Sequence, residues 1–365
     1  MKISHLYTYP IKSLRETPVS EAEVSKHGFL YDRRFMILKV HDDPTSPSGR
    51  RYENMHVAYF PDMTLFSTAI DFPKDGDEGK ITVTFRAPGG GEPRTLDVPL
   101  KPDFAGLETM EVVMHKSPTK AYNTGSEYND WFTKCFGYKV AFAYLGENRR
   151  SVLMTSKDTA QSPKQNSWLS SITSSILLLG SGADDEDKIT FQDCAPYLIV
   201  TQASLNNVSS RLDGEEMDAS KFRPNIILEG ADSEWDEDFW GEIAIGDTKI
   251  SLVQNCVRCQ SINIDYATGK QGATESGKVL KKLQRDRRVD AGHKYSPVFG
   301  RYGFLTKDNT GTSIAVGDEV TVTKRNQERT KFGKRARHRV QCCGNDTPAN
   351  YEKIKTADWP GLCTT

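Results

Sequence analysis

The chain has little net charge and no long apolar run. Its 48 Lys and Arg residues nearly balance 49 Asp and Glu residues, so the formal net charge is -1. No overall field attracts nucleic acid or a membrane surface, and any anion-binding site must be local. The most apolar window, residues 172–180, has about half the length of a membrane-spanning helix. We therefore expect neither a nucleic-acid partner nor an integral membrane span.

The cysteines lack the spacing of a disulfide framework. There are 7 of them, an odd number scattered along the chain, which fits a reducing compartment. The first residues, Met1-Lys2-Ile3-Ser4-His5-Leu6, enter a strand-like pattern at once and leave no room for a signal or transit peptide. We expect a soluble, cytoplasmic protein. Its 365 residues are enough for two domains with an ordinary core.

The first part of the chain is rich in strand patterns. Short alternating runs at 2–9, 35–39 and 80–85 are separated by turn clusters. These runs predict an N-terminal β-barrel-like domain over residues 1–125. A helix follows, with Ser126 as N-cap, Cys135 on its apolar core face and Gly137 as its stop.

Residues 126–188 are assigned to that helix and to a polar insertion. From 155 to 188 the chain is Ser- and Asp-rich around one apolar patch, which predicts a partly disordered surface insertion. The tail, residues 326–365, is basic and then polar. A solvated, disordered tail is the first interpretation, ahead of a nucleic-acid arm. A third is that part of 333–357 is translated intron, because Gly-Lys-Arg and Lys-Thr-Ala can be encoded across splice sites.

A second β-rich unit is expected over residues 189–325. A strand at 197–200 leads into a helix near 201–212, and 225–228 is a buried strand. Gly-Asp between apolar runs, at Gly246-Asp247 and Gly317-Asp318, predicts two hairpin turns. No helix–strand alternation is visible, so we expect antiparallel or barrel-like sheets. The fold class is mixed α+β, predominantly β: two β-barrel domains with a few helices.

Cys256-Val257-Arg258-Cys259 is the motif that points to chemistry. Thiolates are soft ligands for redox metals, and a neighbouring guanidinium lowers the pKa of a thiol. Basic residues elsewhere can hold an anion next to that sulfur, because guanidinium matches phosphate oxygens in a bidentate manner. They are Lys12 with Ser13, one of the adjacent pair Arg33 and Arg34, and Arg223.

In this combination the chain resembles MOSC-domain proteins that carry a MOSC-associated N-terminal β-barrel domain, and it is similar to the mitochondrial amidoxime reducing component family. The resemblance covers roughly residues 1–325 without the insertion, and makes 189–325 the MOSC domain. It rests on residues 9–13, 32–35, 193–205, 222–225, 256–259 and 297–302. The sequence departs from the family at Cys194-Ala195, where hydroxyl residues are usual, and at Val257.

The resemblance implies a molybdenum–molybdopterin cofactor, with Cys259 as the metal ligand. Lys12, Ser13, Arg33 and Arg223 fall on positions that hold the pterin and its phosphate. Asp193, Arg258 and Tyr302 fall on positions that line the cofactor, and Asn225 orders the loop after Arg223. Pyridoxal phosphate binding is also associated with the family as a whole and is assigned to no residue here.

The implied activity is reduction of N-hydroxylated or N-oxide substrates by two-electron oxygen removal, the chemistry coming from the cofactor. Asp193 is a proton relay or a structural hydrogen-bond partner, Arg258 keeps the Cys259 thiolate charged, and Cys256 is packing. The chain has no ferredoxin-type cysteine cluster and no flavin or nicotinamide fingerprint. By resemblance, electrons come from a cytochrome b5 and its NADH-dependent reductase.

Three alternatives stay open. A structural zinc site needs four ligands, and no second CxxC or suitable His pair exists. A thioredoxin-like reductase needs the motif in a βαβ setting, whereas its surroundings here are β-rich. The third keeps the fold: a non-catalytic MOSC module that holds, sulfurates or delivers the molybdenum cofactor.

Overall fold

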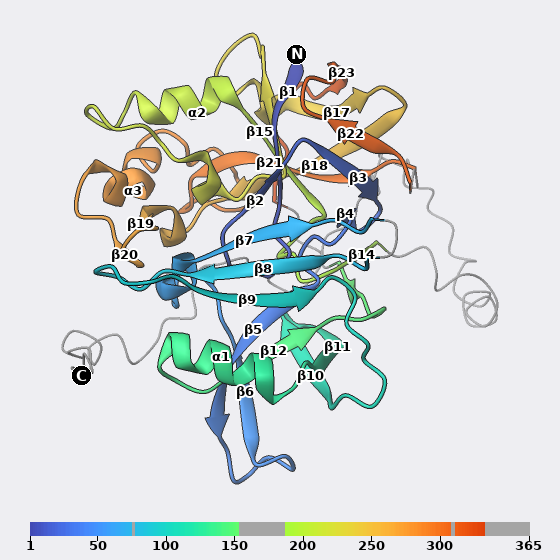
Figure 1. The fold of residues 1–365 in the computed structure, drawn as a ribbon. Coiled ribbons are helices and arrows are strands. Elements are labelled where there is room, and N and C mark those ends of the chain that lie inside the picture. Colours follow the sequence, from blue (N-terminus) through green and yellow to red (C-terminus); the bar gives the residue numbers. More distant parts are fainter. Residues whose placement is uncertain (75–76, 153–186, 308–310, 333–365) are drawn as a thin grey trace, which may run out of the picture.

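The computed structural model describes residues 1–74, 77–152, 187–307 and 311–332 (Figure 1). Strands dominate these ranges, with three α-helices among them, which confirms the predominantly β fold class. The predicted insertion lies outside the described residues except for its last two positions. The predicted intron segment lies wholly outside them. No helix in these ranges has the length and apolar character needed to cross a membrane.

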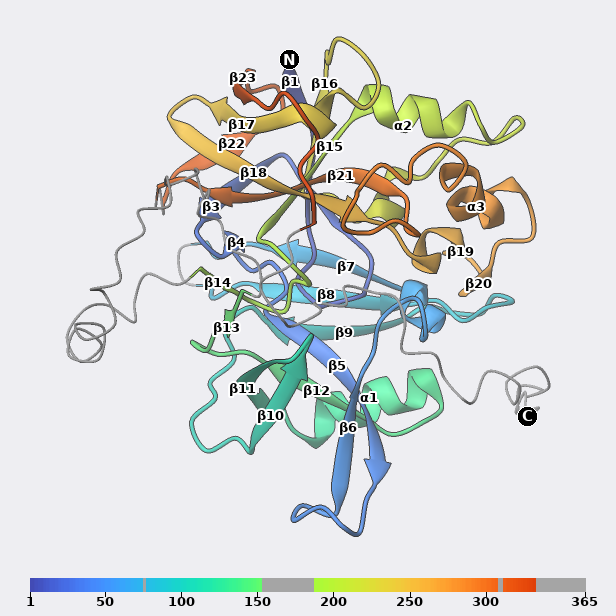
Figure 2. The same cartoon turned by 180° about the vertical axis from the view of Figure 1, so that it is seen from behind.

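The N-terminal half is built from small antiparallel sheets around an aromatic core (Figure 2). The five-stranded sheet has the order β10-β11-β12-β5-β6, and a three-stranded sheet has the order β7-β8-β9. Their bounds are β5 (Phe35–Asp42), β6 (Arg50–Asn54), β7 (Phe66–Asp71), β8 (Lys80–Phe85), β9 (Arg94–Pro99), β10 (Thr109–Met114), β11 (Ser117–Asn123) and β12 (Val140–Tyr144). Phe66, Phe132 and Phe142 pack together and join the two sheets to helix α1 (Ser126–Phe136).

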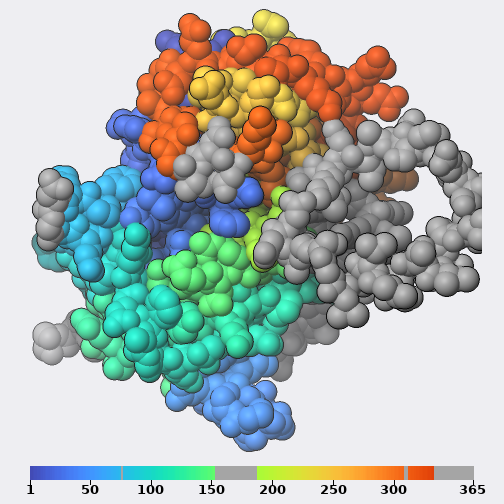
Figure 3. All heavy atoms as spheres, turned by 90° about the vertical axis from the view of Figure 1, so that its right-hand side faces the viewer, coloured from blue at the N-terminus to red at the C-terminus, as the bar shows by residue number. Residues whose placement is uncertain are grey.

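The other half contains an eight-stranded sheet with the order β2-β1-β16-β15-β21-β18-β17-β23. Its members are β1 (Lys2–Thr8), β2 (Thr17–Val19), β15 (Tyr197–Thr201), β16 (Ile226–Glu229), β17 (Trp240–Ile245), β18 (Thr248–Val257), β21 (Val298–Leu305) and β23 (Val320–Arg325). The first strand of the chain therefore lies inside the C-terminal sheet, where it pairs with β16. In Figure 3 the blue N-terminal residues form a band between the orange C-terminal part and the green part. The predicted divisions at 125 and 189 stay predictions.

The remaining elements are short. They are β3 (Glu21–Ser25), β4 (Gly28–Phe29), β13 (Arg150–Ser151), β14 (Lys188–Ile189), β19 (Ile264–Asp265), β20 (Lys270–Gln271) and β22 (Ser313–Ala315), the helices α2 (Gln202–Ser209) and α3 (Val279–Leu283), and the 3-10 turns η1 (Pro61–Leu65), η4 (Ala219–Phe222), η5 (Asp236–Phe239), η6 (Gln260–Asn263) and η7 (Glu275–Lys278).

Two details of the second half differ from expectation. Strands β15 and β16 are parallel and are joined through α2, so the sheet is not purely antiparallel. The turn at Gly246-Asp247 does close a hairpin, between β17 and β18. The turn at Gly317-Asp318 does not, because β22 pairs with β3 whereas β23 pairs with β17. A Gly-Asp pair predicts a turn, but long-range pairing decides where the two strands go.

Helix α1 confirms its predicted end and corrects its start. Gly137 closes the helix in the left-handed conformation, at φ 78°. The N-cap is Gly125 and not Ser126, and no side chain caps the helix from that position. Asn123 lies just before it, and its Oδ1 accepts a hydrogen bond from the Gly125 N–H. Cys135 lies in the core, as predicted.

The first part of the predicted tail, residues 326–332, is packed onto the fold, and we call it the C-terminal strap. Phe332 is buried, and its N–H donates to Asp290 at 3.0 Å. The Thr330 carbonyl accepts a hydrogen bond at 2.8 Å from Nδ2 of Asn255, the residue that precedes Cys256. The boundary at 326 was therefore placed too early, because basic composition concealed the apolar anchor Phe332.

Candidate functional site

The turn after β1 places Lys12 and Ser13 between the two halves. The Lys12 N–H donates to the Phe35 carbonyl at 2.8 Å, next to a parallel bridge between Ile11 and Phe35. Ser13 has a left-handed backbone, at φ 68°, and its hydroxyl donates to the Met55 carbonyl at 3.2 Å. Both side chains are buried. Sheet pairing therefore fixes a lysine and a hydroxyl at one point.

Arg33 and Arg223 meet at the ring of Tyr9. Their Cζ atoms lie 4.3 Å and 4.4 Å from its centroid, as in cation–π contacts. Arg223 ends η4 in the left-handed conformation, and its Nη1 donates to the Leu14 carbonyl at 2.7 Å. The Tyr9 hydroxyl donates to the Pro224 carbonyl at 3.0 Å. Burial is the main reason that the pKa of Tyr9 is raised, so the ring stays neutral between two cations.

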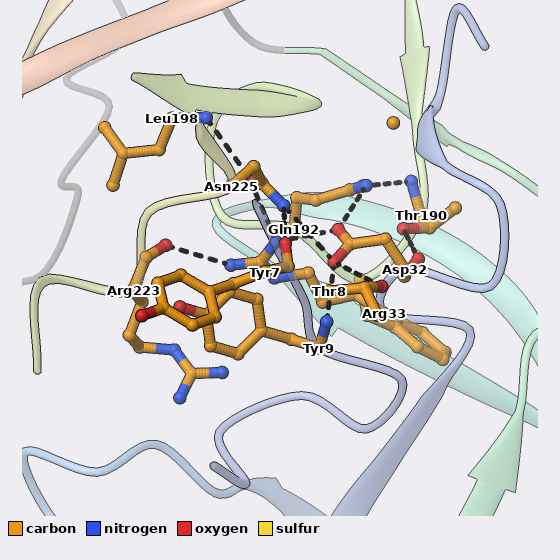
Figure 4. A network of polar contacts seen from close by, with 12 residues as sticks. Tyr7, Thr8, Tyr9, Asp32, Arg33, Thr190, Gln192, Leu198, Arg223 and Asn225 are labelled. Atoms are coloured by element: carbon orange, nitrogen blue, oxygen red, sulfur yellow. Dashed lines mark hydrogen bonds and ion pairs between the residues drawn. The ribbon is translucent and has the colours of Figure 1, made fainter. Parts of the chain in front are cut away.

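Asp32 and Asn225 hold this arrangement in place (Figure 4). Asp32 is buried and accepts from Arg33 Nη1 at 2.7 Å and from the Tyr9 N–H at 2.9 Å. Asn225 accepts from the Leu198 N–H at 3.2 Å and donates from Nδ2 to the Tyr7 carbonyl. These contacts agree with the ordering role predicted for Asn225.

Only one of the two adjacent arginines takes part. Arg33 turns toward Tyr9, whereas Arg34 Nη2 donates to the Gly146 carbonyl and lies 3.9 Å from a Glu147 oxygen. Arg33 has a left-handed backbone, at φ 48°, whereas Arg34 directly precedes β5, so the two side chains reach different partners.

Asp193 carries two charged neighbours. Lys12 Nζ lies 2.5 Å from its Oδ1, and His115 Nε2 lies 3.3 Å from the same oxygen. Burial acts to raise the pKa of Asp193, but the Lys12 ammonium and His115 outweigh it and hold the pKa well below its usual range. His115 was not found from the sequence. Nothing in the local sequence pattern places this residue against Asp193.

The two cysteines of the motif differ in exposure. Cys256 is buried, and burial raises the pKa of its thiol despite the nearby Arg258 guanidinium. Arg258 Nη1 lies 2.8 Å from Cys256 Sγ, and Nη2 donates to the Phe222 carbonyl at 2.9 Å. The Arg258 guanidinium thus contacts Cys256 and also interacts electrostatically with Cys259. Its predicted role of keeping the Cys259 thiolate charged stays a prediction. Cys259 is partly exposed, with its sulfur 3.2 Å from Ser261 Oγ.

Two connections join this motif to the basic residues. Arg258 donates to the carbonyl of Phe222, which is the residue before Arg223. Through Cys194, which packs with Val257 in one apolar cluster, the motif touches the residue after Asp193. Tyr302 packs partly buried against the same cluster. The predicted residues thus lie around one region where the two halves of the molecule meet.

Backbone strain gathers at this region. Seven non-glycine residues in the described ranges have positive φ, among them Ser13, Arg33, Arg223 and His115. Left-handed backbone is unfavourable for such residues and persists where the surrounding structure enforces it, often at functional sites.

Comparison with known proteins assigns two family domains to the chain. Residues 1–139 match the family model of the MOSC N-terminal beta barrel domain, and residues 186–321 match the model of the MOSC domain. The chain is a MOSC-domain protein with the accompanying N-terminal barrel domain.

Relatives cover nearly the whole chain at low identity. Mitochondrial amidoxime-reducing component 1 of Homo sapiens is 28% identical over 327 residues, 87% of this chain and 82% of its own length. Mitochondrial amidoxime reducing component 2 of the same species is 27% identical over 333 residues, with the same coverage. The molybdenum cofactor sulfurase of Arabidopsis thaliana is 26% identical over 330 residues, which are 87% of this chain and 35% of that protein.

The residues of this MOSC protein fit an anionic group beside a soft metal. Lys12, Arg33 and Arg223 bring three positive charges against the carboxylates of Asp32 and Asp193. Within the described residues, the buried Nε of Arg258 and the buried hydroxyl of Ser220 have no hydrogen-bond partner. Unpaired buried donors and an excess of cations are what a site for an anionic ligand requires.

Proposed function

We propose that this MOSC protein holds a molybdenum–molybdopterin cofactor and reduces N-hydroxylated or N-oxide compounds by two-electron removal of oxygen. The observation that carries the proposal is a partly exposed thiol, Cys259, whose motif is connected through Phe222 to the cations Arg223 and Arg33. When bound, the cofactor would supply oxygen-atom and two-electron transfer. The names of the amidoxime-reducing relatives support this substrate class.

The residues divide by what each atom can do. Lys12, Ser13, Arg33 and Arg223 would bind the phosphate and pterin, with Tyr9 keeping the two guanidiniums apart and in place. Cys259 would be the protein ligand of the metal.

Arg258 and Asp193 act beside that metal. Arg258 fixes the buried Cys256 and offers its Nε toward the cofactor region, beside Tyr302. Asp193 stays ionised, because its pKa lies well below the usual range. It would therefore accept hydrogen bonds and not donate a proton.

Electrons would come from outside the chain, from a cytochrome b5 and its NADH-dependent reductase. A cytoplasmic location also stays a prediction, and the animal relatives are named as mitochondrial.

The first test is the metal and pterin content of protein purified from a host that makes molybdenum cofactor. We expect roughly one molybdenum per chain in the wild type. Cys259→Ala removes the only ligand proposed here and should lose it. Cys256→Ala is the matched control, because Cys256 is buried and should mostly spare the metal. Molybdenum retained in both variants would refute the ligand assignment.

The second candidate is a non-catalytic carrier, and the sulfurase relative favours it, because 87% of this chain matches about a third of that protein. Benzamidoxime turnover by the molybdenum-loaded wild type separates the two functions. Loading without turnover in the presence of a competent reductant would support the carrier.

A further inference from the structure

The turn of the β10–β11 hairpin has a left-handed backbone at two non-glycine residues, and the hairpin itself does not explain why these residues are used. His115 and Lys116 alone connect the strands, since Met114 pairs with Ser117. Their φ angles are 49° and 65°. Asn-Gly or Asp-Gly is the usual choice at such a turn, whereas here both positions carry longer side chains. Histidine enters the left-handed region more readily than most other non-glycine residues, so the backbone permits it and its side chain is the feature to explain.

That side chain reaches across to Asp193. The imidazole is 13% exposed, with Nε2 3.3 Å from Asp193 Oδ1. Lys12 contacts the same oxygen. In the described part of the chain, Oδ2 of Asp193 and Nδ1 of His115 make no hydrogen bond. The N-terminal half thus adds a proton-carrying ring to the site, with one nitrogen anchored and the other available.

Four other charged or titratable groups surround the pair. They are the Lys12 ammonium, the Arg33 guanidinium, His56 and, beyond it, Glu53. Burial and the nearby Lys12 charge lower the pKa of His56 to about 4, so His56 is neutral near pH 7. Asp193 stays ionised, as described above. Of the groups gathered here, His115 is the one suited to give and regain a proton.

We propose that His115, anchored by the Asp193 carboxylate, delivers protons to the reaction of the proposed function. Reduction of an N-hydroxylated compound follows R–NH–OH + 2 e⁻ + 2 H⁺ → R–NH₂ + H₂O. The N–O bond breaks, the external donor supplies both electrons, and the departing oxygen must be protonated. His115 gives a proton toward that oxygen and regains one from solvent. Asp193 positions the ring.

The test replaces histidine without disturbing the turn. Asparagine tolerates left-handed backbone, so His115→Asn keeps the hairpin and removes the titrating ring. Lys116→Asn is the matched control on the same turn. Benzamidoxime reduction is driven by reduced methyl viologen, with molybdenum content measured in parallel. We expect His115→Asn to lower kcat at least tenfold, to flatten the pH–rate profile, and to leave KM and molybdenum within twofold. Lys116→Asn should change none of these more than twofold.

Several results would overturn the inference. An unchanged kcat in His115→Asn excludes proton delivery, and a parallel loss of kcat and molybdenum shows a merely structural role. Wild type that loads molybdenum without turnover refutes the reductase itself. A separate readout needs no cofactor: ¹⁵N spectra of the histidine rings in wild type and Asp193→Asn. The His115 signals should change in the variant, while those of His41, paired with Glu53 at 2.7 Å, should not. Identical His115 spectra would refute the pair and with it the inference.

Discussion

Two regions of the molecule bury arginines and differ in how the charge is met. Near the C-terminal strap, Arg287 Nη2 lies 2.9 Å from both oxygens of Asp238, and Arg329 Nε lies 2.8 Å from one of them. At Tyr9, Arg223 instead donates to a backbone carbonyl, and Arg33 shares Asp32 with the Tyr9 N–H. An arginine that pairs with a buried carboxylate holds the fold together, whereas Arg223, which meets a backbone carbonyl and an aromatic ring, is the one proposed to bind an anion.

The sharpest way to break this comparison is Asp238→Ala. The carboxylate is fully buried and removing it leaves the buried Arg287 without its partner. We expect a loss of about 3–5 kcal/mol in the free energy of unfolding, measured with urea. Asp97→Ala is the control, because its pair with Lys80 is exposed and should contribute little to stability. Equal losses in the two variants would contradict the structural role of Asp238.

Glu237, the residue before Asp238, should make the stability of this region depend on pH. Burial raises the pKa of Glu237 from 4.5 to about 7, against hydrogen bonds from Ser204 and Thr201. Because the folded pKa exceeds the unfolded one, the stabilisation is complete below pH 4.5 and is lost as the pH rises through 7. The change is about 3 kcal/mol. The difference in stability between wild type and Glu237→Gln should therefore vary with pH over this window, and a constant difference would refute it.

The smallest effect on stability is expected at the other arginines. Arg223→Gln removes one hydrogen bond and a cation–π contact, together about 1–2 kcal/mol. The same variant should lose most of its molybdenum, because a phosphate-binding charge is gone. Unfolding and metal analysis of one preparation measure both effects. Full retention of molybdenum would place Arg223 with the structural arginines.

Much of the candidate site could be predicted from the sequence because its residues lie in short local motifs. Lys12, Arg33 and Arg223 stand beside recognisable turns, and the structure brings the two arginines to Tyr9 and Lys12 to Asp193. Their roles with a cofactor stay proposals. Their partners depend on register between distant strands, which local patterns do not determine.

The parts that could not be predicted depend on contacts between segments far apart. His115 reaches Asp193 across 78 positions, and no periodicity connects them. The hydrogen bond from Arg258 to the Phe222 carbonyl, 36 positions away, also depends on how distant segments pack. The strap was taken for a disordered tail because its charges are local and its anchoring partners are not.

The place of β1 in the eight-stranded sheet has a consequence for biosynthesis. Ser4 bonds to the carbonyl of Ile227, 223 positions later. At a synthesis rate of about 5–20 residues per second, the first strand emerges about 10–45 s before β16 exists. During that time the edge of β1 has no partner, and the two turns that follow it, with Lys12 and Arg33, lack their final support. The proposed anion site is thus completed late, and the chain could not bind a cofactor there before its synthesis is finished.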